Sequence, residues 1–196
     1  MGKVISVSRA IKFTFVLLII LVICFIGYYA WDQQRTQTIS ATEKEEQRIE
    51  QFLQNNPSDP NAWIALGSNS LQQQKFDKAI SAYEKALSLN AGKPISYTAY
   101  MGLGTAYMEK GISERAIDNF DKAVALSKEP DFNPSKVSLA TIHYYLGKIY
   151  LQKGELDKAT QELVESLSYN ATNADAIFLL GKVYEAQGNV TSAEAI

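Results

Sequence analysis

The sequence predicts an all-α protein in which a single transmembrane helix precedes a solenoid of helix–turn–helix units. Two observations carry this prediction. Residues 13–31 form an apolar run without a charged side chain, and four later segments repeat a Leu-Gly pair in the same helical register. Of the 196 residues, 46% are hydrophobic, which is enough for one sizeable core or for several short units plus an anchor.

The apolar run is long enough to cross a membrane. At about 1.5 Å per residue it spans roughly 28 Å, close to the thickness of a bilayer's hydrocarbon core. Its far end carries three aromatic side chains, which prefer the headgroup level of a membrane: Tyr28, Tyr29 and Trp31. Three basic residues precede the run: Lys3, Arg9 and Lys12. This positive flank predicts that residues 1–12 are cytoplasmic and that the chain from residue 32 onward lies outside the cytoplasm.

Two alternatives to a retained anchor are open. A cleavable signal peptide needs small residues three and one before the cut, but Ala30 is paired with Tyr28, and the run exceeds the usual apolar core of a signal peptide. A bacterial lipoprotein signal would use Cys24, but Ile23 before it is bulky and the apolar run continues past it. We therefore expect residues 13–31 to contact membrane lipid, with Cys24, the only cysteine, facing lipid.

The next segment leads from the anchor to the repeats. Residues 32–42 are polar and aperiodic, which predicts a short tether above the membrane. Ser40 and Glu43 then match a capping box, and the apolar stripe after them predicts an amphipathic helix over about residues 41–54. Because that stripe is too narrow to be stable alone, we expect residues 41–59 to pack on whatever follows.

Four segments of the remaining chain carry the repeat. Each places a leucine and a glycine at its end: Trp63–Gly67, Tyr100–Gly104, His143–Gly147 and Ile177–Gly181. In the last three units a second glycine then ends the first helix: Gly111, Gly154 and Gly188. In all four units an alanine opens the second helix: Ala79, Ala116, Ala159 and Ala193. Since a mid-helix glycine costs about 1 kcal/mol relative to alanine, its recurrence predicts that paired helices approach closely.

This pattern resembles the tetratricopeptide repeat, a helix–turn–helix unit of 34 residues. The resemblance implies a right-handed superhelix, with units at residues 60–93, 94–130, 131–173 and 174–196, the last incomplete, and a half unit at 41–59. The chain departs from the family pattern at Ser70, Leu163 and Ser166, and it carries insertions near Pro94 and Pro134. We expect both prolines to sit at the first position of lengthened first helices.

We predict no catalytic, cofactor-binding or metal site. His143, the only histidine, stands where the other units carry an aromatic or apolar residue, so we expect it to pack between helices. Gly102 and Gly104 lack a third glycine and follow no strand, which indicates packing and not a phosphate cradle. The formal charge of −2 shows no basic excess for nucleic acid, and the sequons at Asn170 and Asn189 are interpreted as incidental.

The repeats instead predict a groove for a protein or peptide. In such a solenoid the first helices line the concave face, and the stripe that does not pack inward faces the groove. This stripe combines apolar, aromatic and methionine side chains with two lysines, which suits a peptide that carries some negative charge. Its residues are Ile64, Ser68, Met101, Thr105, Met108, Tyr144, Lys148, Phe178 and Lys182. Leu71 and Leu151 lie on the same stripe and are equally explained as cover for the adjacent helix.

The resemblance also bears on the kind of partner. Some family members hold a chaperone's C-terminal carboxylate with a Lys/Asn/Arg clamp, but Ile64 and Ser68 occupy the places of that lysine and asparagine, which disfavours this activity. The anchor with repeats outside the cytoplasm is similar to bacterial inner-membrane repeat proteins that assist envelope assembly, including c-type cytochrome maturation. This similarity implies an adaptor or assembly factor, with an accessory structural subunit of a membrane complex as the alternative.

The last unit stops early. Its second helix would begin near Val190, so only about two turns remain before Ile196, and helices that short are marginal in water. We therefore expect Leu180, Val183 and Tyr184 to be partly uncovered. The expectation is that the natural chain continues beyond Ile196 or that another subunit caps this face.

Overall fold

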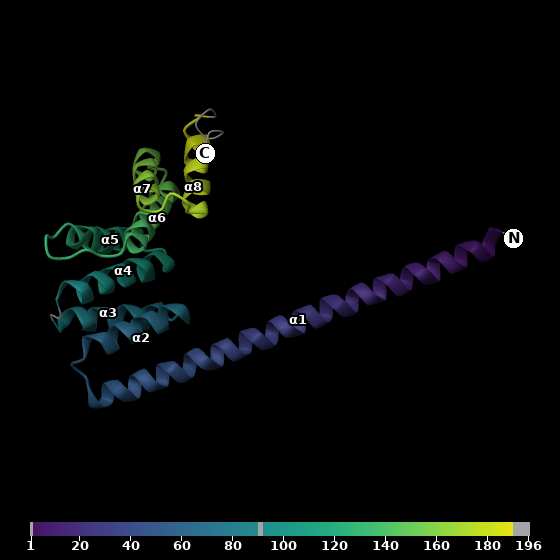
Figure 1. Cartoon of the computed structure of the whole chain (residues 1–196), viewed down its shortest axis with the longest axis horizontal. Helices are drawn as coiled ribbons and strands as arrows, with labels where there is room; N and C mark the ends of the chain where they lie inside the picture. Colours follow the sequence, from purple (N-terminus) through teal and green to yellow (C-terminus); the bar gives the residue numbers. More distant parts are fainter. Residues whose placement is uncertain (1, 90–91, 190–196) are drawn as a thin grey trace. The chain divides into compact units, whose positions relative to one another are not determined.

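The computed structural model describes residues 2–89 and 92–189, with side chains for residues 11–34, 41–89 and 92–189. All regular secondary structure within these residues is α-helical (Figure 1). The helices are α1 (Gly2–Asn55), α2 (Pro60–Gln72), α3 (Phe76–Ser88), α4 (Lys93–Glu109), α5 (Ser113–Ser127), α6 (Lys136–Gln152), α7 (Leu156–Tyr169) and α8 (Ala174–Ala186). The chain forms two compact units, Met1–Glu45 and Glu46–Ile196.

The first unit is part of α1. Within it, Ile11–Gln34 is long and apolar enough to cross a membrane, with a mean hydropathy of 2.6 in its most apolar window and none of that window buried. Large apolar side chains such as Phe13, Leu18 and Phe25 are 68%, 61% and 69% exposed. A helix that is apolar on all sides needs cover from protein or lipid, so length and composition make this segment a candidate membrane span.

The segment predicted as a tether is helical. Residues 32–42 continue α1, so the helix start predicted at Ser40 is wrong, and α1 ends only at Asn55. The reason is that neither glycine nor proline occurs between Gly27 and Pro57. Extending an existing helix costs much less than nucleating a new one, so polar residues of ordinary helix propensity continue it without an apolar stripe.

The second unit begins with the last turns of α1. Leu53 is buried in a small cluster with Ala62 and Leu66 of α2 and Ala82 of α3. The next helix starts sharply, because the Asp59 carboxylate accepts hydrogen bonds from the backbone N–H groups of residues 61 and 62, at 2.8 and 3.3 Å, and Pro60 opens the helix. The end of α1 therefore covers the first helix pair, as the amphipathic pattern predicts.

Close approach of paired helices depends on the predicted glycines. A Cβ at Gly67 would lie 2.7 Å from the Tyr83 ring, one at Gly104 would lie 2.5 Å from the Phe120 ring, and one at Gly147 would lie 2.6 Å from Leu163. A Cβ at Gly102 would also clash with the Tyr83 ring, so the interpretation of Gly102 and Gly104 as packing residues is confirmed. The partner expected for Gly181, Ala193, lies outside the described residues.

The alanines that open the second helices are buried. Ala79, Ala116 and Ala159 are each 0% exposed, opposite the glycine-bearing helices. In unit three, Leu163 and Ser166 replace the usual aromatic and alanine and are also 0% exposed. The Ser166 hydroxyl donates to the Ala140 carbonyl at 2.7 Å, which compensates its burial. The predicted all-α solenoid is confirmed, and these departures from the family pattern are absorbed by local packing.

The insertions lengthen the first helices. Both α4 and α6 have 17 residues, whereas α2 and α8 have 13. Pro94 lies in the first turn of α4, one residue after the predicted first position, which Lys93 occupies. Pro134 precedes α6, so its predicted helical position is wrong. The cause is Ser135, whose side chain accepts from the Ser138 N–H at 3.1 Å and so caps the helix one residue later.

The last described helix is better covered than the sequence indicates. Leu180 and Val183 are 4% and 0% exposed, because they pack with Ala159, Leu163 and Ala176 in one apolar cluster. The expectation that they are partly uncovered is therefore wrong, and only Tyr184 is half-buried. The second helix predicted from Val190 lies outside the described residues.

Candidate partner-binding groove

The predicted groove residues lie on α2, α4, α6 and α8. On α2, Ile64 is half-buried and packs against the main apolar core, whereas Ser68 is exposed. The Ser68 hydroxyl lies 3.1 Å from the Tyr83 hydroxyl, within hydrogen-bonding distance. Burial raises the pKa of Tyr83, although the bond to Ser68 works against the rise. Ser68 therefore also contacts a side chain of the second helix in its own repeat.

The α4 part of the set is the least open. Met101, Thr105 and Met108 are all half-buried, and both methionines pack against the main core. The Thr105 hydroxyl donates to the Met101 carbonyl at 3.0 Å. Much of the surface of these residues is therefore already used within the solenoid, and Leu71 of the same stripe packs on that core as well.

Aromatic and basic side chains are paired on α6 and α8. Tyr144 and Lys148 of α6 are half-buried, and Phe178 and Lys182 of α8 are exposed, the phenyl ring by 62%. The Lys182 ammonium lies 4.5 Å from the centre of the Phe178 ring, a cation–π contact. Each pair is four residues apart, so ring and ammonium share one helix face.

The two pairs belong to neighbouring helices. Tyr144 packs against the cluster that contains Ala176 and Leu180 of α8. Burial raises the pKa of Tyr144, and the Asp175 carboxylate at the start of α8 adds to this rise. Among the described residues, Lys148 has no ion pair with a carboxylate. At this end of the predicted set, two neighbouring helices therefore each have an aromatic ring and an ammonium group, and neither ammonium group forms an ion pair with a carboxylate of the described residues.

His143 is a packing residue, as predicted. It is 8% exposed, its Nδ1 lies 2.7 Å from the Glu162 carboxylate, and its ring stacks on Tyr169 with centroids 5.8 Å apart. The adjoining cavity of about 500 Å³ also contains Asp121, whose pKa is raised by burial and then by Glu162. Within the described part of the chain, no group of three or more His, Cys, Asp and Glu residues is placed to hold a metal ion.

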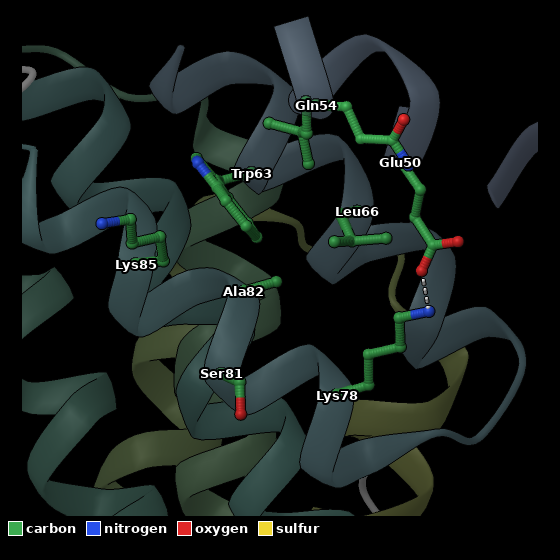
Figure 2. A pocket seen from close by; sticks show the side chains of 9 residues that line it. Glu50, Gln54, Trp63, Leu66, Lys78, Ser81, Ala82 and Lys85 are labelled. Atoms are coloured by element: carbon green, nitrogen blue, oxygen red, sulfur yellow. Dashed lines mark hydrogen bonds and ion pairs between the residues drawn. The ribbon is translucent and has the colours of Figure 1, made fainter. Parts of the chain in front are cut away.

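A further hollow, which the sequence pattern does not predict, lies at the start of the second unit (Figure 2). It has a volume of about 740 Å³ and is lined by Glu50, Leu53, Gln54, Trp63, Leu66, Lys78, Ser81, Ala82 and Lys85. These residues come from three helices, and no single-helix pattern marks them as a set. The local sequence feature that could have indicated the hollow is the pair of adjacent small residues Ser81 and Ala82 on α3.

Comparison with known families identifies the repeats. A tetratricopeptide-repeat model matches residues 64–130, and a second model described as TPR repeat matches residues 147–188, together more than half of the chain. The chain belongs to the tetratricopeptide-repeat family. This confirms the resemblance drawn from the Leu-Gly, glycine and alanine positions.

The relatives share the repeats over part of their length. The chain is 33% identical to the BBSome complex member BBS4 of Bos taurus over 63% of this chain and 21% of that protein. It is 29% identical to the cellulose synthase operon protein C of Pseudomonas fluorescens (strain SBW25) over 72% of this chain and 11% of that protein. The chain thus spans only about a fifth of the first relative's length and about a tenth of the second's.

A solved structure shows the same fold. The crystal structure of MamA superposes with a TM-score of 0.68 at 24% identity, covering 82% of this chain and 87% of MamA. At that identity the likeness concerns the fold alone. Proteins of the tetratricopeptide-repeat family generally mediate protein–protein interaction or the assembly of complexes, and they are typically non-catalytic.

Proposed function

We propose that this protein is a membrane-anchored scaffold or assembly factor that binds a protein or peptide segment in the concave groove of its repeats. The observation that carries the proposal is the exposed Phe178 ring on α8 with Lys182 over its face, together with the Tyr144 and Lys148 pair on the contacting helix α6. Exposed aromatic side chains beside unpaired cations are costly to leave in water and favourable in an interface.

The chemistry of these four residues favours a partner segment with alternating apolar and acidic residues. Its apolar side chains would pack on the two rings, and its carboxylates would pair with the two ammonium groups. Ile64, Ser68, Met101, Thr105 and Met108 extend the same stripe and would line the rest of the path. Because Met101 and Met108 are half-buried, they contribute adaptable apolar contact and less of the binding energy.

The anchor is part of the proposal. The candidate span Ile11–Gln34 would hold the protein as a single-pass protein in a bacterial cytoplasmic membrane, in contact with lipid along residues 13–31. The basic residues Lys3, Arg9 and Lys12 favour a cytoplasmic N-terminus, with the repeats on the other side. A protease added to sealed spheroplasts should then degrade the repeats and leave the first dozen residues protected. Protection of the repeats would reverse this orientation.

An accessory structural subunit of a membrane complex is the second candidate function. The relative BBS4, described as a BBSome complex member, favours it. Purification of the full chain in mild detergent separates the two functions. Several partners below stoichiometric amounts support the scaffold, whereas one stable companion complex at equal stoichiometry would replace it with the subunit. Loss of every partner at physiological salt would argue against both.

A further inference from the structure

The hollow at the start of the second unit is lined by residues from the end of α1, from α2 and from α3 (Figure 2). Its floor is apolar: Leu53, Leu66 and Ala82 are 6%, 5% and 2% exposed and come from three different helices. Trp63 and the rim residues Lys78 and Lys85 stand around this floor in the close view. A volume of about 740 Å³ is within the usual range for binding pockets and admits several side chains.

The hollow is preformed by a fixed tryptophan. The indole N–H of Trp63 donates to the Pro57 carbonyl at 2.8 Å, which holds the ring at one end of the hollow. At the other end, the Lys78 ammonium bonds the Glu50 carboxylate at 2.5 Å and also the buried carboxylate of Glu46. Because both ends are held by these bonds, a ligand would not have to order Trp63 or Lys78 on binding.

The charge at the rim is not balanced. Lys78 is neutralised by Glu46 and Glu50, but no carboxylate or hydrogen-bond partner of the Lys85 ammonium is found among the described residues. Figure 2 shows Lys85 on the Trp63 side of the hollow, with only the Glu50–Lys78 pair joined by a dashed line. The apolar floor thus has one uncompensated positive charge beside its tryptophan, which a carboxylate on the ligand would complement.

This hollow and the concave groove use different faces of α2. With about 100° between successive residues of a helix, the face of Trp63 and Leu66 is turned about 150° from the face of Ile64 and Ser68. None of the lining residues belongs to the predicted groove set. One helix therefore has binding chemistry on two nearly opposite sides, and occupation of one does not block the other.

We propose that this hollow is a second docking site, which takes an amphipathic segment of a partner protein with a bulky aliphatic or aromatic side chain next to a carboxylate. The bulky side chain fills the space between Trp63, Leu66 and Ala82, and the carboxylate pairs with Lys85. This site goes beyond the proposed groove function and does not depend on it. With two docking faces the chain holds two segments at once, as an assembly factor requires.

The test follows Trp63 fluorescence in the full chain in detergent micelles. The chain has two tryptophans, so Trp31→Phe leaves Trp63 as the reporter. Two probes are titrated: a tryptophan-free helical peptide with leucines at i, i+3 and i+4 and glutamates at the other positions, and the same peptide with lysines for the glutamates. The expected result is a Trp63 emission shift with the acidic peptide and a Kd about tenfold lower than for the basic one.

Three variants place the site. Ser81→Phe adds a ring at an exposed lining position and should weaken binding of the acidic peptide about tenfold. Lys85→Glu should weaken it about fivefold, whereas Lys136→Glu, the same charge change at an exposed position on α6, should not. The groove variant Tyr144→Ala with Lys148→Glu should leave the Trp63 signal unchanged.

Each other outcome overturns the proposal. Equal or tighter binding of the basic peptide would contradict the role of Lys85. Binding that survives Ser81→Phe in a folded protein, or that is lost only in the groove variant, would place the peptide elsewhere. A Trp63 signal that depends on protein concentration without peptide, and disappears with Ser81→Phe, would assign the hollow to a second copy of the chain.

Discussion

Gly104 of α4 lies against the face of Phe120 in α5, so closely that a Cβ on the glycine would meet the ring at 2.5 Å. Phe120 is 0% exposed and also stacks on Tyr145 of α6, with ring centroids 5.8 Å apart. The ring therefore has no free space to move into. This one contact links a helix pair to the first helix of the next pair.

The first prediction is that Gly104→Val destabilises the repeats by about 2 kcal/mol, because it overpacks this contact. Thr105→Val is the matched control, since it places the same residue one position along at a half-buried site of the predicted groove set. Thermal and urea unfolding of both variants measure the difference. A midpoint for Gly104→Val equal to that of the control would show that the helix pairing does not depend on the glycine.

The second prediction concerns Glu46, which is 5% exposed at the end of α1. Burial by itself raises the pKa of its carboxyl. Hydrogen bonds from Lys75 and Lys78, helped by one from Gln73, outweigh that effect and lower the pKa from 4.5 to about 2. Since the folded pKa is below the unfolded one, the stabilisation is present above about pH 4.5 and is lost as the pH falls toward 2.

Glu46→Gln should therefore lower the free energy of unfolding by about 1 to 3 kcal/mol at pH 7, and the difference from wild type should shrink steadily below pH 4.5. Glu50→Gln removes a carboxylate whose side chain is 45% exposed and that shares Lys78, so its effect should be below about 1 kcal/mol. A loss at Glu46 that does not change down to pH 2 would rule out this ion-pair account.

The third prediction uses the turn between α2 and α3. Gln74 has a positive φ of 59°, at the place where the later turns have Gly111, Gly154 and Gly188 at 74°. The same backbone hydrogen bonds close these turns: Gln74 N–H donates to the Leu71 carbonyl at 2.9 Å, as Gly111 N–H does to Met108. A left-handed conformation costs a residue with a Cβ about 1 to 2 kcal/mol, partly offset by the extra entropy of unfolded glycine.

Gln74→Gly should therefore stabilise the protein by about 0.5 kcal/mol, and Gly154→Ala should destabilise it by about 1 kcal/mol. Equilibrium unfolding in urea measures both. If Gln74→Gly destabilises the protein while Gly154→Ala does not, the turn geometry is not what fixes these positions.

The helix pairs could be predicted from the sequence because their signals are local. Glycine and alanine at fixed spacing allow two paired helices to approach each other closely. Gly67, Gly104 and Gly147 each lie against a large side chain of the partner helix. The boundary at Pro134 and the continuity of α1 were mispredicted for a shared reason. In both places one local start signal, the proline preference at Pro134 and the capping box at Ser40, was overruled by its neighbours: Ser135 caps α6 one residue later, and α1 continues through Ser40.

The candidate sites were predictable only in part. The stripe of i, i+4 and i+7 residues follows from helix geometry, but the burial of each residue depends on the neighbouring helices. Met101 and Phe178 therefore occupy equivalent positions in their repeats, yet Met101 is half-buried and Phe178 is exposed. The hollow beside Trp63 is formed by residues 50–85 from three helices. Its shape depends on side-chain packing between helices, which periodicity within one helix does not contain.

The central claim is that a partner segment lies in the concave groove, and site-specific photocrosslinking in intact cells tests it most directly. A benzophenone side chain replaces Phe178 in one variant and Val164, an exposed apolar residue of α7, in the control. We expect a discrete crosslinked product from position 178 that weakens when Lys148 and Lys182 are both changed to glutamate, and no such product from position 164. Equal products from both positions, or a product from position 164 alone, would contradict it.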